Sequence, residues 1–162
     1  MCVSNRDLFH GFSLQSVDDK GRVAIPADLR ETLDGNSPAK QVLITRHPTL
    51  PCLVCYDAGW AQELNDRLNN LARNAKAAGQ AFDESAERRA MRAEKATYDA
   101  NGRFVIPGFE KDRASIKRWA FFVGDGDTFQ IWAPDVLIAS DHDDEDLKER
   151  CRYYAAAKKV AL

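Results

Sequence analysis

The stretch that decides the fold is Val17-Asp-Asp-Lys-Gly-Arg-Val-Ala-Ile-Pro26, and it returns in altered form as Tyr98-Asp-Ala-Asn-Gly-Arg-Phe-Val-Ile-Pro107. Both copies contain an apolar or aromatic residue, Asp, two variable residues, Gly, Arg, a short β-prone run ending in Ile, and Pro. The spacing is the same throughout, and no gap interrupts the match. Two copies of one pattern predict a duplicated half-domain and not a solenoid, which needs more repeats.

Each copy predicts a tight turn between two strands. Asp tolerates turn geometry and its carboxylate can accept backbone N–H groups, while Gly supplies a positive φ. After each turn, Val23 and Ile25 in one copy and Phe104 and Ile106 in the other alternate as on a half-buried strand. The proline that follows each copy ends the strand and suits the start of a helix.

An arginine follows each predicted turn. Arg22 and Arg103 stand at the turn ends, with Asp18 and Asp99 four residues earlier, where a carboxylate can hold the turn and orient the guanidinium group. Planar guanidinium groups suit phosphates and the O6/N7 edge of guanine. The two turns are therefore candidate nucleic-acid contacts. The alternative is a structural Asp–Arg pair that only makes a surface turn rigid.

Composition limits the function classes. With 162 residues, the chain is long enough for one domain or two small ones. No apolar run is long enough to span a membrane and the start lacks a signal-peptide pattern, so we expect a cytoplasmic protein without a membrane partner. The formal net charge of −2 argues against a broadly basic nucleic-acid binder. Any DNA affinity must then come from local basic turns, multiplied by oligomerisation.

The cysteines do not indicate a chemical site. Cys2, Cys52, Cys55 and Cys151 are too few and too scattered for a disulfide framework. The pair Cys52 and Cys55 lacks the second pair that would close a zinc site, and it lies in a strand-like run. We expect reduced thiols, no metal and no cofactor. Since we find no nucleophile–base pair and no Gly-rich phosphate loop, we also expect that the protein is not an enzyme.

The remaining pattern predicts the same order of elements in both halves, and no Pro/Gly/Ser linker separates them, so we expect the halves to interlock. The predicted parts are a first repeat at 12–57, a helical connection at 58–92, a second repeat at 93–136 and a C-terminal helical tail at 137–162. Within them we expect a strand at 8–16, a short helix stopped at 34–36, a long helix from Asp57 to Gly79, a helix at 83–96 and an acidic run at 141–146. The helix at 83–96 carries Arg88, Arg89 and Arg92, which we leave outside the candidate DNA site because glutamates dilute them.

With these motifs the chain resembles the MraZ family, the double SpoVT/AbrB-type regulators found beside bacterial division and cell-wall genes. The match runs from about residue 8 to 136. The residues that carry it are Leu8-Phe9-x-Gly11, Asp18-Asp-Lys-Gly-Arg22, Ile25-Pro26-x-x-Leu-Arg30, Cys52-Leu53, Trp60, Asp99-Ala-Asn-Gly-Arg103, Ile106-Pro107, Val123-Gly124 and Phe129-x-Ile-Trp132.

The resemblance implies an α+β fold in which two AbrB/SpoVT-type swapped-hairpin halves interlock in one chain, with connecting helices and a C-terminal helix. It implies a ring-like homo-oligomer that binds direct repeats in double-stranded DNA and represses its own promoter and adjacent genes, in association with the nucleoid. Carried over residue by residue, the DNA-contacting arginines are Arg22 and Arg103, the supporting phosphate contacts are Lys20 and Arg30, and the turn-holding residues are Asp18, Gly21, Asp99 and Gly102.

The second copy departs from the first in its basic residues. Lys111 stands where the first copy has Arg30, and Asn101 stands where it has Lys20. We therefore expect the second turn to carry less charge and to contribute less to DNA affinity. Two other readings remain open: a module of the same fold that binds a protein, as an antitoxin does, and a purely structural ring. A regulatory protein partner also remains open.

Overall fold

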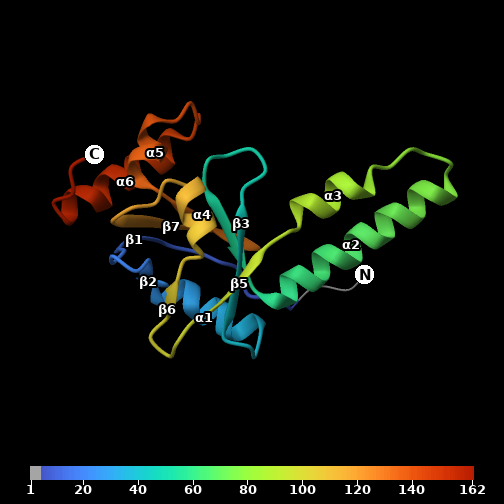
Figure 1. The fold of residues 1–162 in the computed structure, drawn as a ribbon, viewed down its shortest axis with the longest axis horizontal. Helices are drawn as coiled ribbons and strands as arrows, with labels where there is room; N and C mark the ends of the chain where they lie inside the picture. Colours follow the sequence, from blue (N-terminus) through green and yellow to red (C-terminus); the bar gives the residue numbers. More distant parts are fainter. Residues whose placement is uncertain (1–4) are drawn as a thin grey trace.

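The computed structural model describes residues 5–162 as an α+β protein with two antiparallel sheets (Figure 1). The strands are β1 (Phe12–Ser16), β2 (Arg22–Ala24), β3 (Gln41–Arg46), β4 (Leu53–Tyr56), β5 (Glu94–Thr97), β6 (Arg103–Val105), β7 (Trp119–Asp125) and β8 (Thr128–Trp132). The helices are α1 (Ala27–Asn36), α2 (Ala58–Ala77), α3 (Glu84–Ala90), α4 (Gly108–Arg113), α5 (Pro134–Ala139) and α6 (Glu145–Ala157).

The halves interlock through their strand pairing. The larger sheet has the order β1-β7-β8-β4-β3-β5, and β2 pairs with β6 to form a separate two-stranded ribbon. The first strand of each half therefore pairs in the other half, β1 with β7 and β5 with β3. The ribbon takes one strand from each copy of the repeated motif. This exchange confirms the swapped, interlocked fold that the repeat predicted.

Apolar side chains fill both faces of the larger sheet. The main core lies between the sheet and a layer made by the ribbon, α1 and α4, where Val23, Leu29 and Phe104 are buried. A second core lies on the opposite face, where Leu147 and Cys151 of α6 pack with Trp132 and Phe121 of the sheet. Since the inward-facing residues of the ribbon are buried, its other face is left to solvent.

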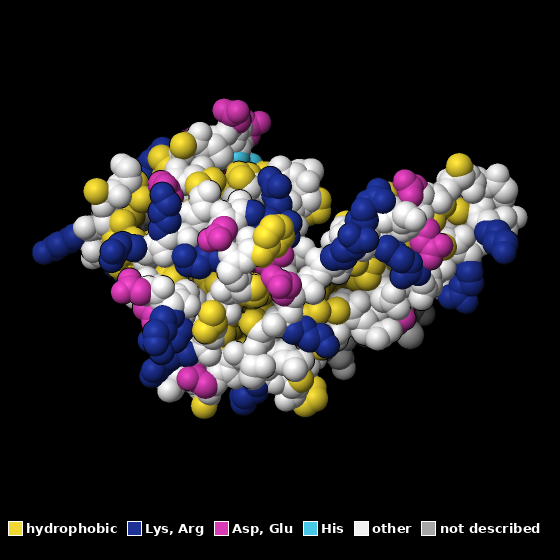
Figure 2. All heavy atoms as spheres, viewed as in Figure 1, with side chains coloured by type: hydrophobic (Ala, Val, Ile, Leu, Met, Phe, Trp, Pro, Cys, Tyr) yellow, Lys and Arg dark blue, Asp and Glu magenta, His cyan; other side chains and the backbone are white. Residues whose placement is uncertain are grey.

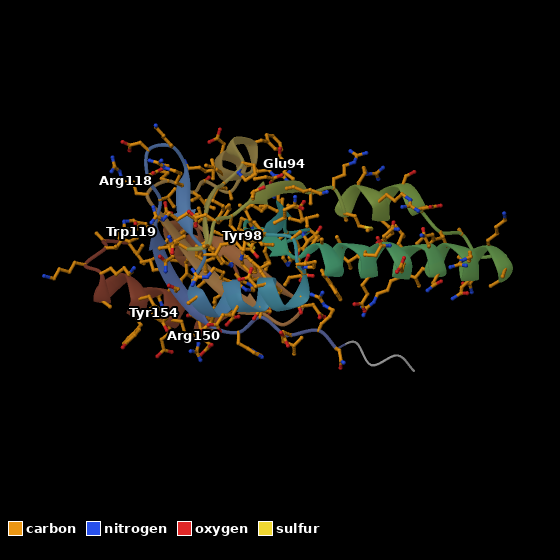
Figure 3. All side chains as sticks on the ribbon, turned by 90° about the horizontal axis from the view of Figure 1, so that it is seen from below. Glu94, Tyr98, Arg118, Trp119, Arg150 and Tyr154 are labelled. Carbon is orange, nitrogen blue, oxygen red and sulfur yellow. The ribbon has the colours of Figure 1, made fainter. Side chains whose placement is uncertain are left out.

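Helices α2 and α3 form an arm that extends from the body on the side away from the C-terminal helices (Figures 1 and 3). Asp57 caps α2 by accepting the Trp60 N–H at 3.0 Å. Trp60, Leu64, Leu68 and Leu71 form an apolar stripe along α2, in which Trp60 and Leu68 are buried and Leu71 is 56% exposed. The stripe therefore anchors only the first part of the arm to its surroundings.

Two predicted boundaries need correction and one is confirmed. The helix expected at 83–96 ends at Ala90, because Glu94–Thr97 pairs with β3 as strand β5. The first helix ends at Asn36, within the predicted stop at 34–36, and the Asn36 side-chain amide donates to the Asp7 carbonyl at 2.9 Å. The strand expected at 8–16 begins only at Phe12, after an isolated bridge at Phe9.

The structure also describes the cysteines and the character of the helices that bear on membrane crossing. Cys52, Cys55 and Cys151 are free and buried, while Cys2 lies outside the described residues. Burial raises the pKa of the Cys52 thiol to about 12 and that of Cys151 to about 11, so both are protonated at neutral pH. Among residues 5–162, none of the helices has the length and apolar character needed to cross a bilayer.

Candidate nucleic-acid interface

The two Asp-x-x-Gly turns have nearly the same backbone geometry. In the first turn, the Asp18 N–H donates to the Arg22 carbonyl and the Gly21 N–H donates to the Asp18 carbonyl, both at 3.0 Å. In the second turn, the equivalent bonds of Asp99 and Gly102 measure 3.0 and 2.9 Å. Gly21 has a φ of 78° and Gly102 a φ of 79°, the left-handed region that glycine adopts at least cost.

The aspartate side chains hold these turns. The Asp18 Oδ1 atom accepts the backbone N–H groups of Lys20 and Arg22, both at 2.9 Å. The Asp99 Oδ1 atom accepts those of Asn101 and Arg103 at 2.9 and 3.0 Å. The bond from the arginine N–H is the largest cause that lowers the pKa of each carboxyl below its ordinary value. Both groups are therefore charged at neutral pH, and the turns stay closed.

The two arginine side chains differ in how they are held. The Arg22 Nε atom donates to Asp18 Oδ2 at 2.6 Å, in an ion pair whose side chains are 56% and 40% exposed. Arg103 bonds Asp99 through its backbone N–H, and its guanidinium forms no ion pair within residues 5–162. The predicted Asp–Arg orientation is thus present at the first turn and limited to the backbone at the second.

The ribbon presents both arginines on one face. In its register Arg22 lies opposite Val105 and Ala24 lies opposite Arg103, while the alternate residues of the two strands face the core. Arg22 and Arg103 are therefore diagonal neighbours, a separation of roughly 7–8 Å in a twisted sheet. Both line one open groove of about 620 Å³ together with Asp18 and Asp99. A two-stranded ribbon is also narrow enough to enter the DNA major groove.

Strand exchange moves the supporting cations to the opposite turns. A Cβ atom built on Gly102 would lie 3.1 Å from Nη1 of Arg30, so Arg30 of α1 lies against the second turn. A Cβ atom built on Gly21 would lie 3.5 Å from Cδ of Lys111, so Lys111 of α4 lies against the first turn. The charge of Arg30 also contributes to the lowered pKa of Asp99.

This placement corrects the expectation that the second turn carries less charge. Counted with its neighbour from the other half, each turn has one more cation than anions. The first turn combines Asp18, Asp19, Lys20, Arg22 and Lys111, and the second combines Asp99, Arg103 and Arg30. Sequence reasoning missed Lys111 as a neighbour of the first turn. The signal that could have identified it is the exchange itself, since helices that follow swapped strands end beside the opposite turn.

The turn glycines give a stability prediction. An alanine at either position is forced into the left-handed region, at a cost of roughly 1–2 kcal/mol. At Gly102 the new Cβ would also lie 2.9 Å from the Ile25 carbonyl oxygen, whereas at Gly21 the corresponding Ile106 oxygen is 3.7 Å away. We therefore expect Gly102→Ala to lower Tm by more than Gly21→Ala in thermal unfolding followed by circular dichroism. Equal losses, or the reverse order, would contradict the geometry of the two turns.

A duplicated α+β unit that exchanges strands and carries two Asp-x-x-x-Arg turns on one ribbon has the architecture of the double AbrB-type regulators. No family model matches the chain. A protein from Ruegeria sp. (strain TM1040), named transcriptional regulator MraZ, is 32% identical over 136 residues, 78% of each chain. Proteins of the same name from Azotobacter vinelandii and Pectobacterium carotovorum are 32% and 28% identical, over 82% and 88% of this chain and 84% and 90% of theirs.

The chain belongs to the MraZ family of transcriptional regulators. Members of this family are named as regulators and not as enzymes, in agreement with the function class that the sequence indicated.

Proposed function

We propose that the protein is a sequence-specific DNA-binding repressor that acts on its own promoter and on adjacent division and cell-wall genes. In this proposal the solvent face of the ribbon meets double-stranded DNA, and Arg22 and Arg103 read bases or clamp phosphates. Lys20, Arg30 and Lys111 add phosphate contacts, while Asp18, Gly21, Asp99 and Gly102 hold the turns. The observation that carries the proposal is the pair of arginines at opposite corners of one exposed ribbon face.

The relatives support the regulatory part, since each is named a transcriptional regulator. We take residues 12–57 and 93–136 as the two DNA-binding repeats, joined by the helical connection. Binding at chromosomal operators would associate the protein with the nucleoid.

The acidic net charge makes assembly part of the same proposal. One ribbon with a few cations binds a duplex weakly, because phosphate neutralisation supplies most of the affinity of DNA-binding proteins. A ring-like homo-oligomer that presents ribbons to successive direct repeats gains from effective concentration, which can raise affinity about 10²–10⁴-fold without any new contact. A chain with a net charge of −2 can then bind tightly at a site with several repeats.

The gain in affinity from assembly is tested with duplexes taken from the DNA upstream of the protein's own gene. We expect a duplex with several direct repeats to bind about 10²–10⁴ times more tightly than a duplex with one repeat at equal salt. We also expect affinity to fall steeply as salt rises. Electrophoretic mobility shifts across protein concentration and salt measure both, with a scrambled duplex of equal length as the control. Equal affinity for one repeat and for several would overturn the assembly mechanism.

A further inference from the structure

Two charged features of the sequence have no part in the proposed DNA interface: the arginines of α3 and the acidic run at 141–146. The structure separates the arginines into two groups. Arg88 ties the arm together, because it donates to Glu84 of its own helix at 2.7 Å and to Asn69 of α2 at 2.9 Å. Arg89 and Arg92 instead line a cleft of about 640 Å³ between the arm and the body.

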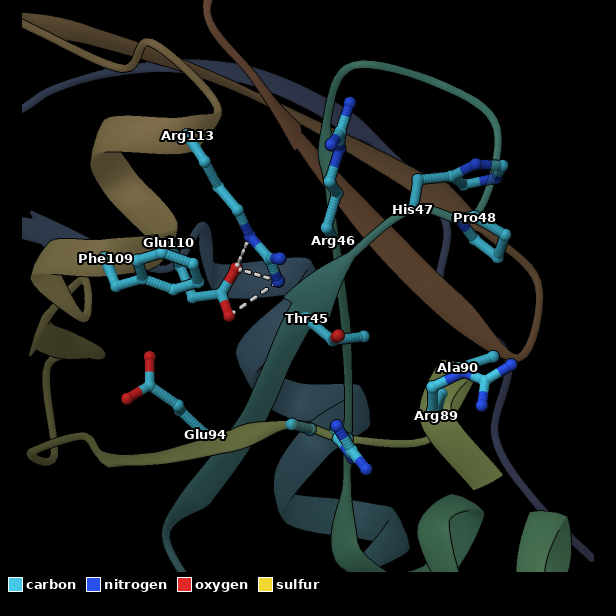
Figure 4. A pocket seen from close by; sticks show the side chains of 12 residues that line it. Thr45, Arg46, His47, Pro48, Arg89, Ala90, Glu94, Phe109, Glu110 and Arg113 are labelled. Atoms are coloured by element: carbon cyan, nitrogen blue, oxygen red, sulfur yellow. Dashed lines mark hydrogen bonds and ion pairs between the residues drawn. The ribbon is translucent and has the colours of Figure 1, made fainter. Parts of the chain in front are cut away.

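Residues of β3, α3, β5 and α4 line this basic cleft. Arg46 enters it from β3, Arg89 from α3 and Arg113 from α4 (Figure 4). Figure 2 shows the same region as a notch beside which Lys and Arg side chains gather on the arm. Arg113 is already paired, since it donates to both oxygens of the buried Glu110 at 2.6 and 2.8 Å. Among the described residues, Arg46, Arg89 and Arg92 are exposed and form no ion pair.

One exposed aromatic side chain also lines the cleft. The Phe109 side chain is 68% exposed and lies against the Arg113 guanidinium, 4.8 Å from the ring centroid. An exposed aromatic ring in a cleft that also holds unpaired arginines favours a polypeptide with carboxylates over a bare phosphate chain, because the ring offers contact to backbone and apolar atoms.

The acidic segment at 141–146 carries the complementary charge. It contains five acidic residues, of which Asp144 caps α6 and Asp146 bonds Arg150. Asp141, Asp143 and Glu145 are exposed and form no ion pair within residues 5–162. The segment is anchored to the body, because the His142 ring stacks on Trp132 with ring centroids 5.9 Å apart. It is therefore a positioned patch of negative charge.

The two patches do not meet within one chain. His47 lies between them: it lines the basic cleft, and it also lines a second cavity together with Asp144 and Asp146. In the described part of the chain, the carboxylates of the acidic segment and the arginines of the cleft form no ion pair. Within residues 5–162, the exposed Arg46, Arg89 and Arg92 of the cleft and the exposed Asp141, Asp143 and Glu145 of the segment therefore have no ion-pair partner, although Glu94 also lines the cleft.

We propose that the acidic segment of one copy docks into the basic cleft of a second copy. The two surfaces are different parts of the same chain, so the contact is heterologous, and it repeats from copy to copy until the set closes. This inference rests on the homo-oligomer of the proposed function and names the surfaces that build it. Its charge pairs are partly exposed, so the assembly weakens as salt rises.

The test reverses the charge of each patch and measures mass by size-exclusion chromatography with light scattering. We expect Arg89→Glu with Arg92→Glu to lose the wild-type assembly, because two acidic patches repel. We expect the triple variant Asp141→Lys, Asp143→Lys, Glu145→Lys to lose it for the opposite reason, because its segment then carries three lysines against the two remaining acidic residues. Mixing the two variants restores assembly, since each cleft then meets a segment of opposite charge. Arg73→Glu with Lys76→Glu, on exposed positions of α2 outside the cleft, is the matched control and keeps the wild-type mass.

The outcomes separate this inference from the proposed function. If the wild type is a monomer at every concentration, the homo-oligomer of the proposed function fails as well. If the wild type assembles and both reversal variants assemble equally well, only the docking inference is wrong. If the Arg89 and Arg92 variant keeps its mass but loses DNA binding, the cleft is a nucleic-acid contact and the inference is also wrong. Circular dichroism of each variant checks that the fold is intact.

Discussion

The double variant Arg22→Ala, Arg103→Ala is expected to lose specific DNA binding by roughly 30-fold or more, while its fold and assembly are unchanged. A well-placed arginine that donates to guanine O6 and N7 contributes about 1–3 kcal/mol of discrimination against the wrong base. Two such losses amount to about 2–6 kcal/mol per chain. In an assembly, the deficit is repeated at every ribbon that contacts the DNA.

We expect these substitutions to leave the fold intact. Arg22 and Arg103 face solvent, and the core residues Val23 and Phe104 point to the other side of the ribbon. The expected cost in stability is therefore within about 0.5 kcal/mol, as for most surface substitutions. Arg22→Lys with Arg103→Lys keeps the charge and removes the planar fork, so we expect it to retain nonspecific affinity and lose sequence preference. Full specific binding by the alanine variant would refute the role of these arginines.

The largest stability loss is expected for Asp57→Ala, about 3–5 kcal/mol. The Asp57 side chain is fully buried, accepts two bonds from Arg6 at 2.8 Å and caps α2 through the Trp60 N–H. Removing the carboxylate leaves the Arg6 side chain, which is only 12% exposed, with the longer contact to Asp127 at 3.9 Å, and removing one partner of a buried pair is the costly way to break it. The loss of the helix cap adds to it. Urea unfolding measured by fluorescence of the tryptophans gives the free energy of unfolding.

Asp83→Ala is the matched control for this prediction. Asp83 also caps a helix, by accepting the Ala86 N–H at 3.0 Å, but it is exposed and pairs with no arginine within residues 5–162. We expect it to cost only about 1 kcal/mol, the usual value for a lost cap. If Asp57→Ala costs no more than Asp83→Ala, the Arg6–Asp57 pair does not stabilise the fold.

The Arg6–Asp57 pair makes the stability of the fold depend on pH. Burial opposes the ionisation of Asp57, but the bonds from Arg6 and from the Trp60 N–H outweigh it and hold its pKa below the ordinary value. The folded state therefore binds a proton at this group less readily than the unfolded state. The stability that it contributes is present above about pH 5 and falls as the pH drops through the lowered pKa of the folded state. The Asp57→Ala variant should lose less stability than the wild type over that range.

The turns and their repetition were predictable because they depend on local chemistry. Asp accepts backbone N–H groups and Gly adopts positive φ whatever the rest of the chain does. The end of the helix at Ala90 was not predictable from residues 83–96 alone. Residues 91–93 separate the helix from strand β5, whose pairing with β3 overrides a weak local preference for helix.

The positions of Arg30 and Lys111 beside the turns were also not predictable from the local sequence. In sequence, Arg30 follows the first turn and Lys111 follows the second, yet each lies against the other turn. That placement follows from strand exchange between the halves, which is set by long-range pairing. The basic cleft was also beyond the sequence, because Arg46, Arg89 and Arg113 come from three elements that only the fold brings together.

In the proposed function, both halves present equivalent arginines to DNA from one ribbon. This equivalence is tested most directly by fluorescence anisotropy titrations with labelled DNA from upstream of the protein's own gene. Wild type, Arg22→Ala and Arg103→Ala are compared at one salt concentration, after light scattering has shown equal assembly. We expect a comparable loss of affinity in both single variants, because the two turns carry equal net charge. If one variant loses binding and the other binds as the wild type does, the two halves are not equivalent and the claim is wrong.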